Sequence, residues 1–125
     1  MSTLKRRSFE ILSLAARAAA TTNSSAYDCK EFGKASLLVR SAAETGTPDA
    51  RTLDVKLQGS LDESGDNWVD ITSGAITQIT AANANQQKYD IVIQGMRRVR
   101  VVHVLAFTNG TTPTLQTQVV LGLYQ

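Results

Sequence analysis

The chain has 125 residues, a formal net charge of +2, 19% charged residues and 6% aromatic residues. This length supplies one domain, which buries enough surface to need neither a disulfide framework nor a structural metal. A dedicated nucleic-acid binder would need a cationic stripe or a set of stacking aromatic rings, and the composition offers little of either. The sequence therefore indicates one self-supporting domain without a nucleic-acid partner.

The beginning of the chain imitates a secretory signal, because a basic run at residues 5–7 precedes apolar residues. Two charged side chains, Glu10 and Arg17, interrupt that apolar region, so its uncharged part is only residues 11–16. No stretch of the sequence approaches the eighteen or so apolar residues of a membrane span. We therefore expect a retained N-terminal segment, a soluble protein and no membrane partner.

The N-terminal segment, residues 1–24, differs in pattern from the rest of the chain. Phe9 and Ile11 would suit one face of a strand, but Phe9 also begins a helical spacing with later apolar residues. The Thr-, Ser- and Asn-rich stretch at 21–25 has the composition of a linker. We expect residues 1–24 to form an extended N-terminal arm and linker, and residues 25–125 to form the domain. The domain itself, a neighbouring copy or a partner could hold such an arm.

From about Lys34 onward, apolar and polar residues alternate, which is the pattern of half-buried strands. The apolar stripes are Ala35, Leu37 and Val39; Leu53, Val55 and Leu57; Tyr89, Ile91 and Ile93; Val99, Val101, His103, Leu105 and Phe107; and Leu115, Val119, Leu121 and Leu123. Each stripe has to be covered, and a second one-sided sheet is the simplest cover. The sequence therefore predicts an all-β fold, an antiparallel β-sandwich of jelly-roll-like type with seven or eight strands.

Turn signals rich in Gly, Asn and Pro separate the stripes. They lie at residues 45–48, 63–67, 73–74, 83–85 and 109–113. Short strands broken at such spacing are typical of a sandwich or barrel. The turns at 45–48 and 109–113 both combine Gly, Thr and Pro and precede similar strands. That similarity fits shared hairpin chemistry, with an internal duplication as the alternative.

Side chains that could carry chemistry are few. His103 is the only histidine and Cys29 the only cysteine, so the chain has neither a His-based metal cluster nor an internal disulfide. His103 falls on the predicted inward face of a strand, which favours a hydrogen-bonded core histidine over a catalytic base, and Cys29 suits a small buried apolar position. No phosphate loop, nucleophile elbow or zinc spacing is present. We expect no enzymatic activity, no cofactor and no bound metal.

Two features leave alternatives open. The acidic turn at 62–67, with Asp70 nearby, has enough oxygens for a calcium ion, but it lacks a calcium-loop pattern and suits a solvated hairpin turn better. Trp68 would be a sugar-stacking platform if it were exposed, and the chain would then be a carbohydrate-binding module. The simpler interpretation is that Trp68 packs on the edge or end of the sandwich.

Two basic clusters remain, one on the arm and one where the strand of residues 99–107 begins. Isolated surface charges contribute little to stability, so the clusters are better suited to selecting a partner with an acidic surface. The predicted interface residues are Lys5, Arg6, Arg7, Phe9 and Ile11 on the arm, and Arg97, Arg98 and Arg100 on the strand.

Several segments carry a family resemblance when taken together. They are GTP at 46–48, LDVKLQGS at 53–60 followed by Asp62, WVDI at 68–71, RVRVV at 98–102 and GTTP at 110–113. As a set spanning roughly residues 23–123, they resemble small virion proteins of tailed phages, some of which look like head decoration, or cement, proteins.

The resemblance implies a β-sandwich on the outer surface of a phage head, made in the host cytoplasm and commonly trimeric where major capsid proteins meet. The implied partners are the major capsid protein and further copies of this chain. A protein that binds only the assembled shell stabilises that shell, and an arm that adds a strand to a neighbouring sheet is a suitable means of attachment. The alternatives are a tail or neck virion subunit and a carbohydrate-binding module that uses Trp68.

Overall fold

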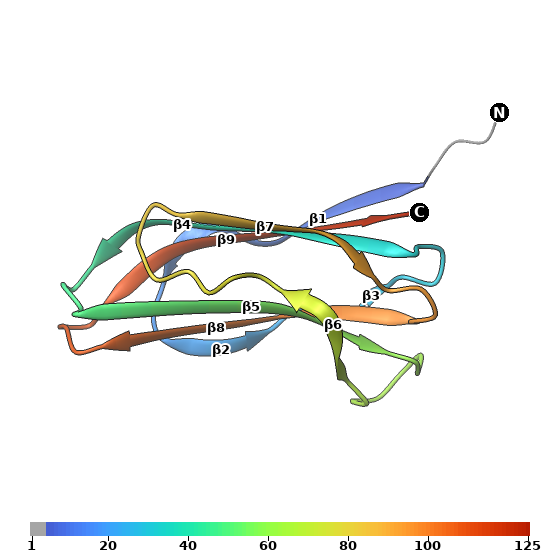
Figure 1. Ribbon diagram of the computed structural model, residues 1–125. Coiled ribbons are helices and arrows are strands. Elements are labelled where there is room, and N and C mark those ends of the chain that lie inside the picture. Colours follow the sequence, from blue (N-terminus) through green and yellow to red (C-terminus); the bar gives the residue numbers. More distant parts are fainter. Residues whose placement is uncertain (1–4) are drawn as a thin grey trace.

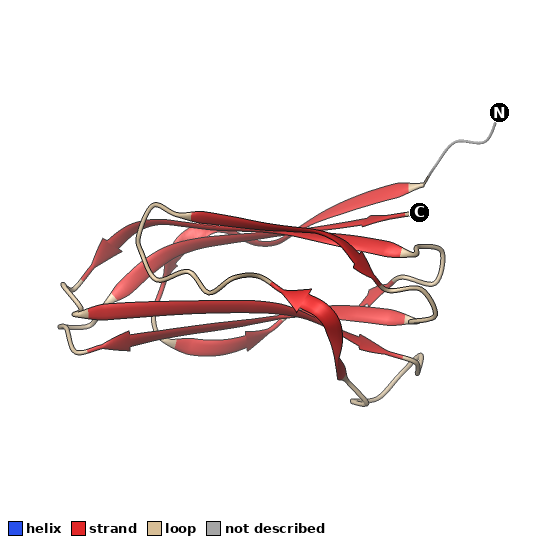
Figure 2. Cartoon of the chain, viewed as in Figure 1, coloured by secondary structure: helices blue, strands red, loops and turns tan. Residues whose placement is uncertain are grey.

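The computed structural model describes residues 5–125, and every regular element in that range is a strand (Figures 1 and 2). The strands are β1 (Arg6–Arg17), β2 (Ala20–Asn23), β3 (Tyr27–Asp28), β4 (Lys34–Thr45), β5 (Ala50–Ser60), β6 (Val69–Ala75), β7 (Asn85–Val92), β8 (Arg98–Thr108) and β9 (Thr114–Tyr124). Within these residues no helix is long and apolar enough to cross a membrane.

The strands form two antiparallel sheets packed face to face, as Figure 1 shows. The first sheet has the order β1-β9-β4-β7, and the second has the order β2-β8-β5-β6, with the short β3 also paired to β8. The chain crosses repeatedly between the sheets, and the first strand lies beside the last, which is the jelly-roll arrangement. The predicted sandwich is confirmed. The described residues form nine strands because β2 and β3 pair separately with β8.

Alternate residues of the long strands fill the space between the sheets. In β9 the inward positions are buried and the positions between them are half-exposed. The buried set is Leu115, Thr117, Val119, Leu121 and Leu123. Each fully buried Leu or Val contributes roughly 1.5–3 kcal/mol relative to an exposed one, so these stripes supply most of the stabilisation of the fold.

Tyr89 departs from its predicted stripe. Ile91 is buried as predicted, but Tyr89 is 64% exposed. The pairing register of β4 and β7 shifts between Ala35 and Leu37, and Asp90 has a left-handed φ of 55°. This bulge adds a residue to β7, which turns Tyr89 to the outer face of the sheet.

The N-terminal residues differ from the expected arm, because most of them are strands of the sandwich. β1 pairs with β9 in the first sheet, and β2 pairs with β8 in the second. The register of β1 slips between Glu10 and Leu12 and again between Leu12 and Ala15. These two bulges break the alternation of apolar residues, which is why the sequence also fitted a helical spacing. The domain itself thus holds residues 6–17 and 20–23, and residues 1–4 of the expected arm lie outside the described residues.

The turns that join β4 to β5 and β8 to β9 pack against each other. Their glycines, Gly46 and Gly110, have φ values of 83° and 96°, and the Thr111 amide donates a hydrogen bond to the Gly46 carbonyl at 2.9 Å. A Cβ at Gly46 would lie 2.5 Å from the Thr111 carbonyl oxygen, so the contact requires glycine. The turn predicted at 73–74 is instead an irregularity inside β6, where Ser73 has a φ of 58°.

Candidate partner-binding surface

The outer face of the first sheet carries a groove of about 300 Å³ that crosses the strands. The pairing registers place Ser8 of β1 and Ser36 of β4 on either side of Gly122 of β9. A Cβ at Gly122 would approach the Ser36 hydroxyl oxygen to 2.8 Å. The groove exists because three neighbouring strands place small residues in the same row.

Larger side chains stand beside this row. Arg6 and Lys34 pair with Tyr124 from its two neighbouring strands. The Tyr124 hydroxyl donates to Asp90 Oδ1 at 2.6 Å and accepts from the Asp90 amide at 3.0 Å. Burial, and then the hydrogen bond to Asp90, raise the pKa of Tyr124. Tyr89, exposed by the bulge in β7, lies at the far side of the groove.

Arg6 and Arg7 give the groove a positive charge. Both line it, and neither forms an ion pair with any carboxylate of residues 5–125. The Arg7 guanidinium lies 5.3 Å from the centre of the Phe9 ring, close enough for a cation–π contact. Two arginines therefore keep donors available for an acidic ligand at the groove.

The other predicted residues of β1 and its flank have contacts within the chain. Lys5 pairs with Glu31 at 2.6 Å. Phe9 and Ile11 are half-buried and pack against the core, with the Phe9 ring centre 4.5 Å from that of Tyr27. Of the five interface residues predicted near the N-terminus, only the two arginines line the groove, and the other three have contacts within the chain.

Trp68 lies on the outer face of the second sheet with two of the predicted arginines. Its ring centre is 4.7 Å from the guanidinium carbon of Arg98 and 4.6 Å from that of Arg100. Arg98 also donates to the Asp62 and Gly65 carbonyls at 2.8 and 3.0 Å. Trp68 is therefore outside the core, and Arg98 links its ring to the loop between β5 and β6.

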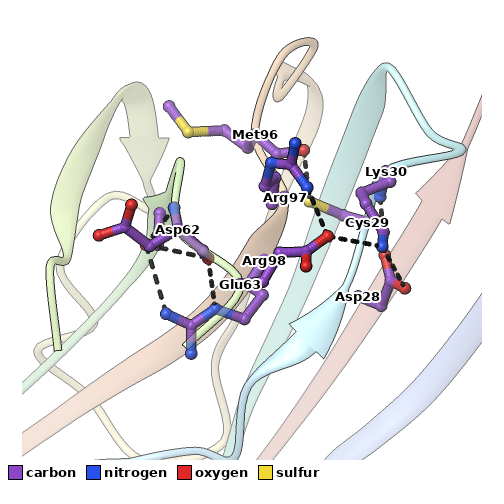
Figure 3. A network of polar contacts seen from close by, with 9 residues as sticks. Asp28, Cys29, Lys30, Asp62, Glu63, Met96, Arg97 and Arg98 are labelled. Carbon is purple, nitrogen blue, oxygen red and sulfur yellow. Dashed lines mark hydrogen bonds and ion pairs between the residues drawn. The ribbon is translucent and has the colours of Figure 1, made fainter. Parts of the chain in front are cut away.

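The same loop is tied to the rest of that end of the sandwich by Glu63 (Figure 3). Glu63 forms ion pairs with Arg97 and with Lys30, the second at 3.1 Å. The hydrogen bond from Lys30 is the largest influence holding the pKa of Glu63 below its usual value. Arg97, the third predicted residue of the strand cluster, is thus paired inside the chain.

The acidic turn engages protein donors. The Asp62 carboxylate accepts a hydrogen bond from the Asn67 amide. Hydrogen bonds from Gln58 and then from Lys56 lower the pKa of Asp70. Throughout residues 5–125, no three His, Cys, Asp or Glu side chains are grouped so as to hold a metal ion.

His103 is buried, with 2% of its surface exposed, as predicted for a core histidine. Its Nε2 lies 3.0 Å from the Thr117 hydroxyl, which also accepts a hydrogen bond from Arg17 Nε at 3.0 Å. Burial, and then the charge of Arg17, lower the pKa of His103 to about 4. Cys29 is also buried as predicted, and burial followed by the charge of Asp28 raises its pKa to about 11, so its thiol is unreactive.

Sequence reasoning identified Arg6 and Arg7 but missed the other residues of the groove. These are Ser8, Ser36, Tyr89, Gly122, Leu123 and Tyr124. They come from four strands, and the pairing register that joins them is not written in any one segment. The one available signal was Gly122, a small residue at an outward position of a strongly alternating strand.

The fold is similar to that of known viral structures. A chain in the structure of infectious bursal disease virus, Gx strain, matches with a TM-score of 0.59 and 8% identity over 98% of this chain and 32% of that chain. A chain of the Gt strain matches with a TM-score of 0.49 and 8% identity over 97% and 33% of the two chains. A chain of Desmodium yellow mottle tymovirus matches with a TM-score of 0.39 and 8% identity over 98% of this chain and 87% of that chain.

The likeness to the Gx-strain chain concerns the fold alone, because the sequence identity is 8%. The chain spans about a third of the length of the first viral chain. No protein-family model and no curated protein matches the sequence. The chain thus has an antiparallel β-sandwich fold that also forms part of a larger chain in a virus structure.

Proposed function

We propose that this protein is a structural virion subunit that decorates the outside of a phage head and stabilises it. Two observations support the proposal: the sequence segments that resemble phage decoration proteins, and the sandwich fold shared with part of a viral chain. The role is non-catalytic and needs no cofactor. Many copies that bind only the assembled shell would stabilise it by mass action.

The observation that carries the proposal to particular residues is the groove with Arg6 and Arg7 at its edge. A guanidinium binds a carboxylate through two parallel hydrogen bonds, so two arginines that form no ion pair within residues 5–125 are suited to an acidic segment of a neighbour. The proposed occupant is an acidic segment of the major capsid protein. A second candidate contact surface has less support, because its arginines already have contacts within the chain. These are Arg97, Arg98 and Arg100.

The test is binding to phage shells that lack the protein. The double variant Arg6→Glu/Arg7→Glu should bind at least about tenfold more weakly, because charge complementarity becomes repulsion. Arg40→Glu is the matched control, since Arg40 is an exposed arginine of β4 and does not line the groove. Cosedimentation with the shells at increasing salt concentration measures the binding of the double variant and of the control. Equal binding by the wild type and the double variant, with both folded, would exclude the groove as the contact.

The proposal includes self-association into trimers on the outer capsid surface. Light scattering on the purified protein measures the number of subunits, and imaging of whole particles shows whether the protein lies on the head or on the tail. A tail or neck location would keep the virion role and replace the decoration role. Sugar binding through Trp68 has less support, because Arg98 and Arg100 cover its ring.

A further inference from the structure

The outer face of the first sheet is arranged in rows of side chains that run across the strands. β1, β9 and β4 are neighbours in this sheet (Figure 1), and their registers align the outward residues of all three. The groove lies over the row of Ser8, Gly122 and Ser36. From β1 to β4 this row is about 10 Å long, and the rows on its two sides are about 14 Å apart. These dimensions fit one extended segment lying across the strands.

One side of the groove is cationic. Its row has Arg6 and Lys34 on either side of Tyr124. Arg6 forms no ion pair with any carboxylate of residues 5–125. Lys34 has one contact, at 4.0 Å, with an Asp90 oxygen that also accepts the shorter hydrogen bond from Tyr124. An exposed ion pair at that distance contributes little, so both cations can engage a ligand.

The other side of the groove is apolar except at β1. Its row has Val120 of β9 and Leu38 of β4, both half-buried, next to Glu10 of β1. Val120 and Leu38 offer a contact surface to an apolar side chain, whereas the Glu10 carboxylate repels an acidic one. The two sides of the groove therefore select different side chains, with acidic groups directed to the cationic side.

We propose that the groove binds an extended segment with the order acid–apolar–acid. Successive side chains of an extended chain point to opposite sides. Both acids then face Arg6 and Lys34, and the middle residue packs on Val120 and Leu38. The acids are about 7 Å apart, a spacing that the long side chains of arginine and lysine can match. The identity of the partner rests on the proposed function, since the segment is assigned to the major capsid protein.

Two synthetic peptides of the same composition test the order of the side chains. The acetylated and amidated peptide SDLDS has the order acid–apolar–acid, whereas SDDLS directs one acid to the apolar side. NMR titration of the purified protein should show at least about fivefold tighter binding of SDLDS. The shifted amide signals should belong to residues 6–8, 34–38 and 120–124. Equal affinity of the two peptides would leave only a charge effect and overturn the proposal.

Two pairs of variants test the location. Gly122→Val fills the floor of the groove, since even a Cβ there would approach the Ser36 hydroxyl oxygen to 2.8 Å. Gln118→Val makes a similar change at an outward position of β9 beyond the groove. Lys34→Gln removes one cation, and Arg40→Gln, exposed on the same strand, is its control. Binding of SDLDS should weaken at least about fivefold in Gly122→Val and Lys34→Gln and stay within about twofold in the controls. Unchanged binding in folded Lys34→Gln would overturn the proposal, even if Gly122→Val did not fold.

Cosedimentation with phage shells that lack the protein separates this inference from the proposed function. A protein that discriminates between the peptides but does not bind shells would keep the site and lose the capsid protein as its partner. Equal shell binding by the wild type and by folded Gly122→Val would keep the decoration role and exclude the groove as its site.

Discussion

His103 joins the two sheets by a polar contact in a core that is mostly apolar. The histidine comes from β8, and Thr117 and Arg17 come from β9 and β1. A buried neutral imidazole is stable there, but a charged one would lose its solvation and meet the nearby guanidinium. Protonation of this single side chain therefore opposes folding.

The pH dependence of stability should show this effect. The pKa of His103 is about 4 in the folded protein and 6.5 in the unfolded chain, so only the unfolded chain takes up the proton between these values. The free energy of unfolding should be unaffected above pH 6.5 and fall by up to about 3 kcal/mol as the pH decreases to about 4. Urea unfolding of wild type and His103→Gln across this range measures it. The stability difference between them should change by that amount, and parallel curves would contradict the buried neutral histidine.

At the scale of elements, the conformation of the loop between β5 and β6 is held mainly by Arg98, which lies outside the loop on β8. Arg98 donates to two of its carbonyls and contacts the ring of Trp68 that follows it. Glu63, in the middle of the loop, ties it to Lys30 and Arg97. A residue that the sequence suggested for a partner contact thus shapes a neighbouring loop.

The substitution Arg98→Lys should loosen this loop. Lysine keeps the charge but loses the planar group that reaches both carbonyls, which should cost about 1–2 kcal/mol. Arg100→Lys is the control, because Arg100 contacts the same ring but donates to the Gln58 side chain instead of the loop. Hydrogen exchange of the amides of residues 61–67 should accelerate in the first variant only. Equal acceleration in both would assign the effect to the Trp68 contact.

The elements that the sequence predicted well are those with uninterrupted alternation. β5, β8 and β9 place their apolar stripes inward as predicted. Prediction failed where an extra residue enters a strand, as in β1 and at Tyr89 of β7, because one inserted residue reverses the face of those after it. The groove depends on such a bulge and on pairings between distant strands, so only its arginines were predictable.

At the scale of the whole molecule, the N-terminal segment completes the sandwich. β1 covers one edge of β9, and its Phe9, Ile11 and Leu12 pack on the core. Lys5 and Gln125 are hydrogen-bonded to each other at the end of this pair of strands. The sequence suggested an arm separate from the domain, whereas the structure gives β1 a part in the core.

Deletion of residues 5–17 should therefore unfold the protein. The loss of β1 exposes apolar side chains on the core face and leaves the edge of β9 unpaired. Circular dichroism and urea titration should show no cooperative unfolding transition. A synthetic peptide of residues 5–17 should restore the transition when added. A truncated chain that unfolds cooperatively without the peptide would show instead that this segment is dispensable.

The pairing of β1 with β9 also sets the order in which the chain acquires its shape during synthesis. Among the strands of the described residues, β1 is synthesised first, and its sheet partner, β9, is synthesised last. Phe9 and Ile11 therefore stay exposed to water and to other nascent chains until β9 has been synthesised. Contacts between distant segments form slowly because long loops must close first. The sandwich is thus completed only after β9 has left the ribosome, and until then the apolar side chains of β1 are an aggregation hazard.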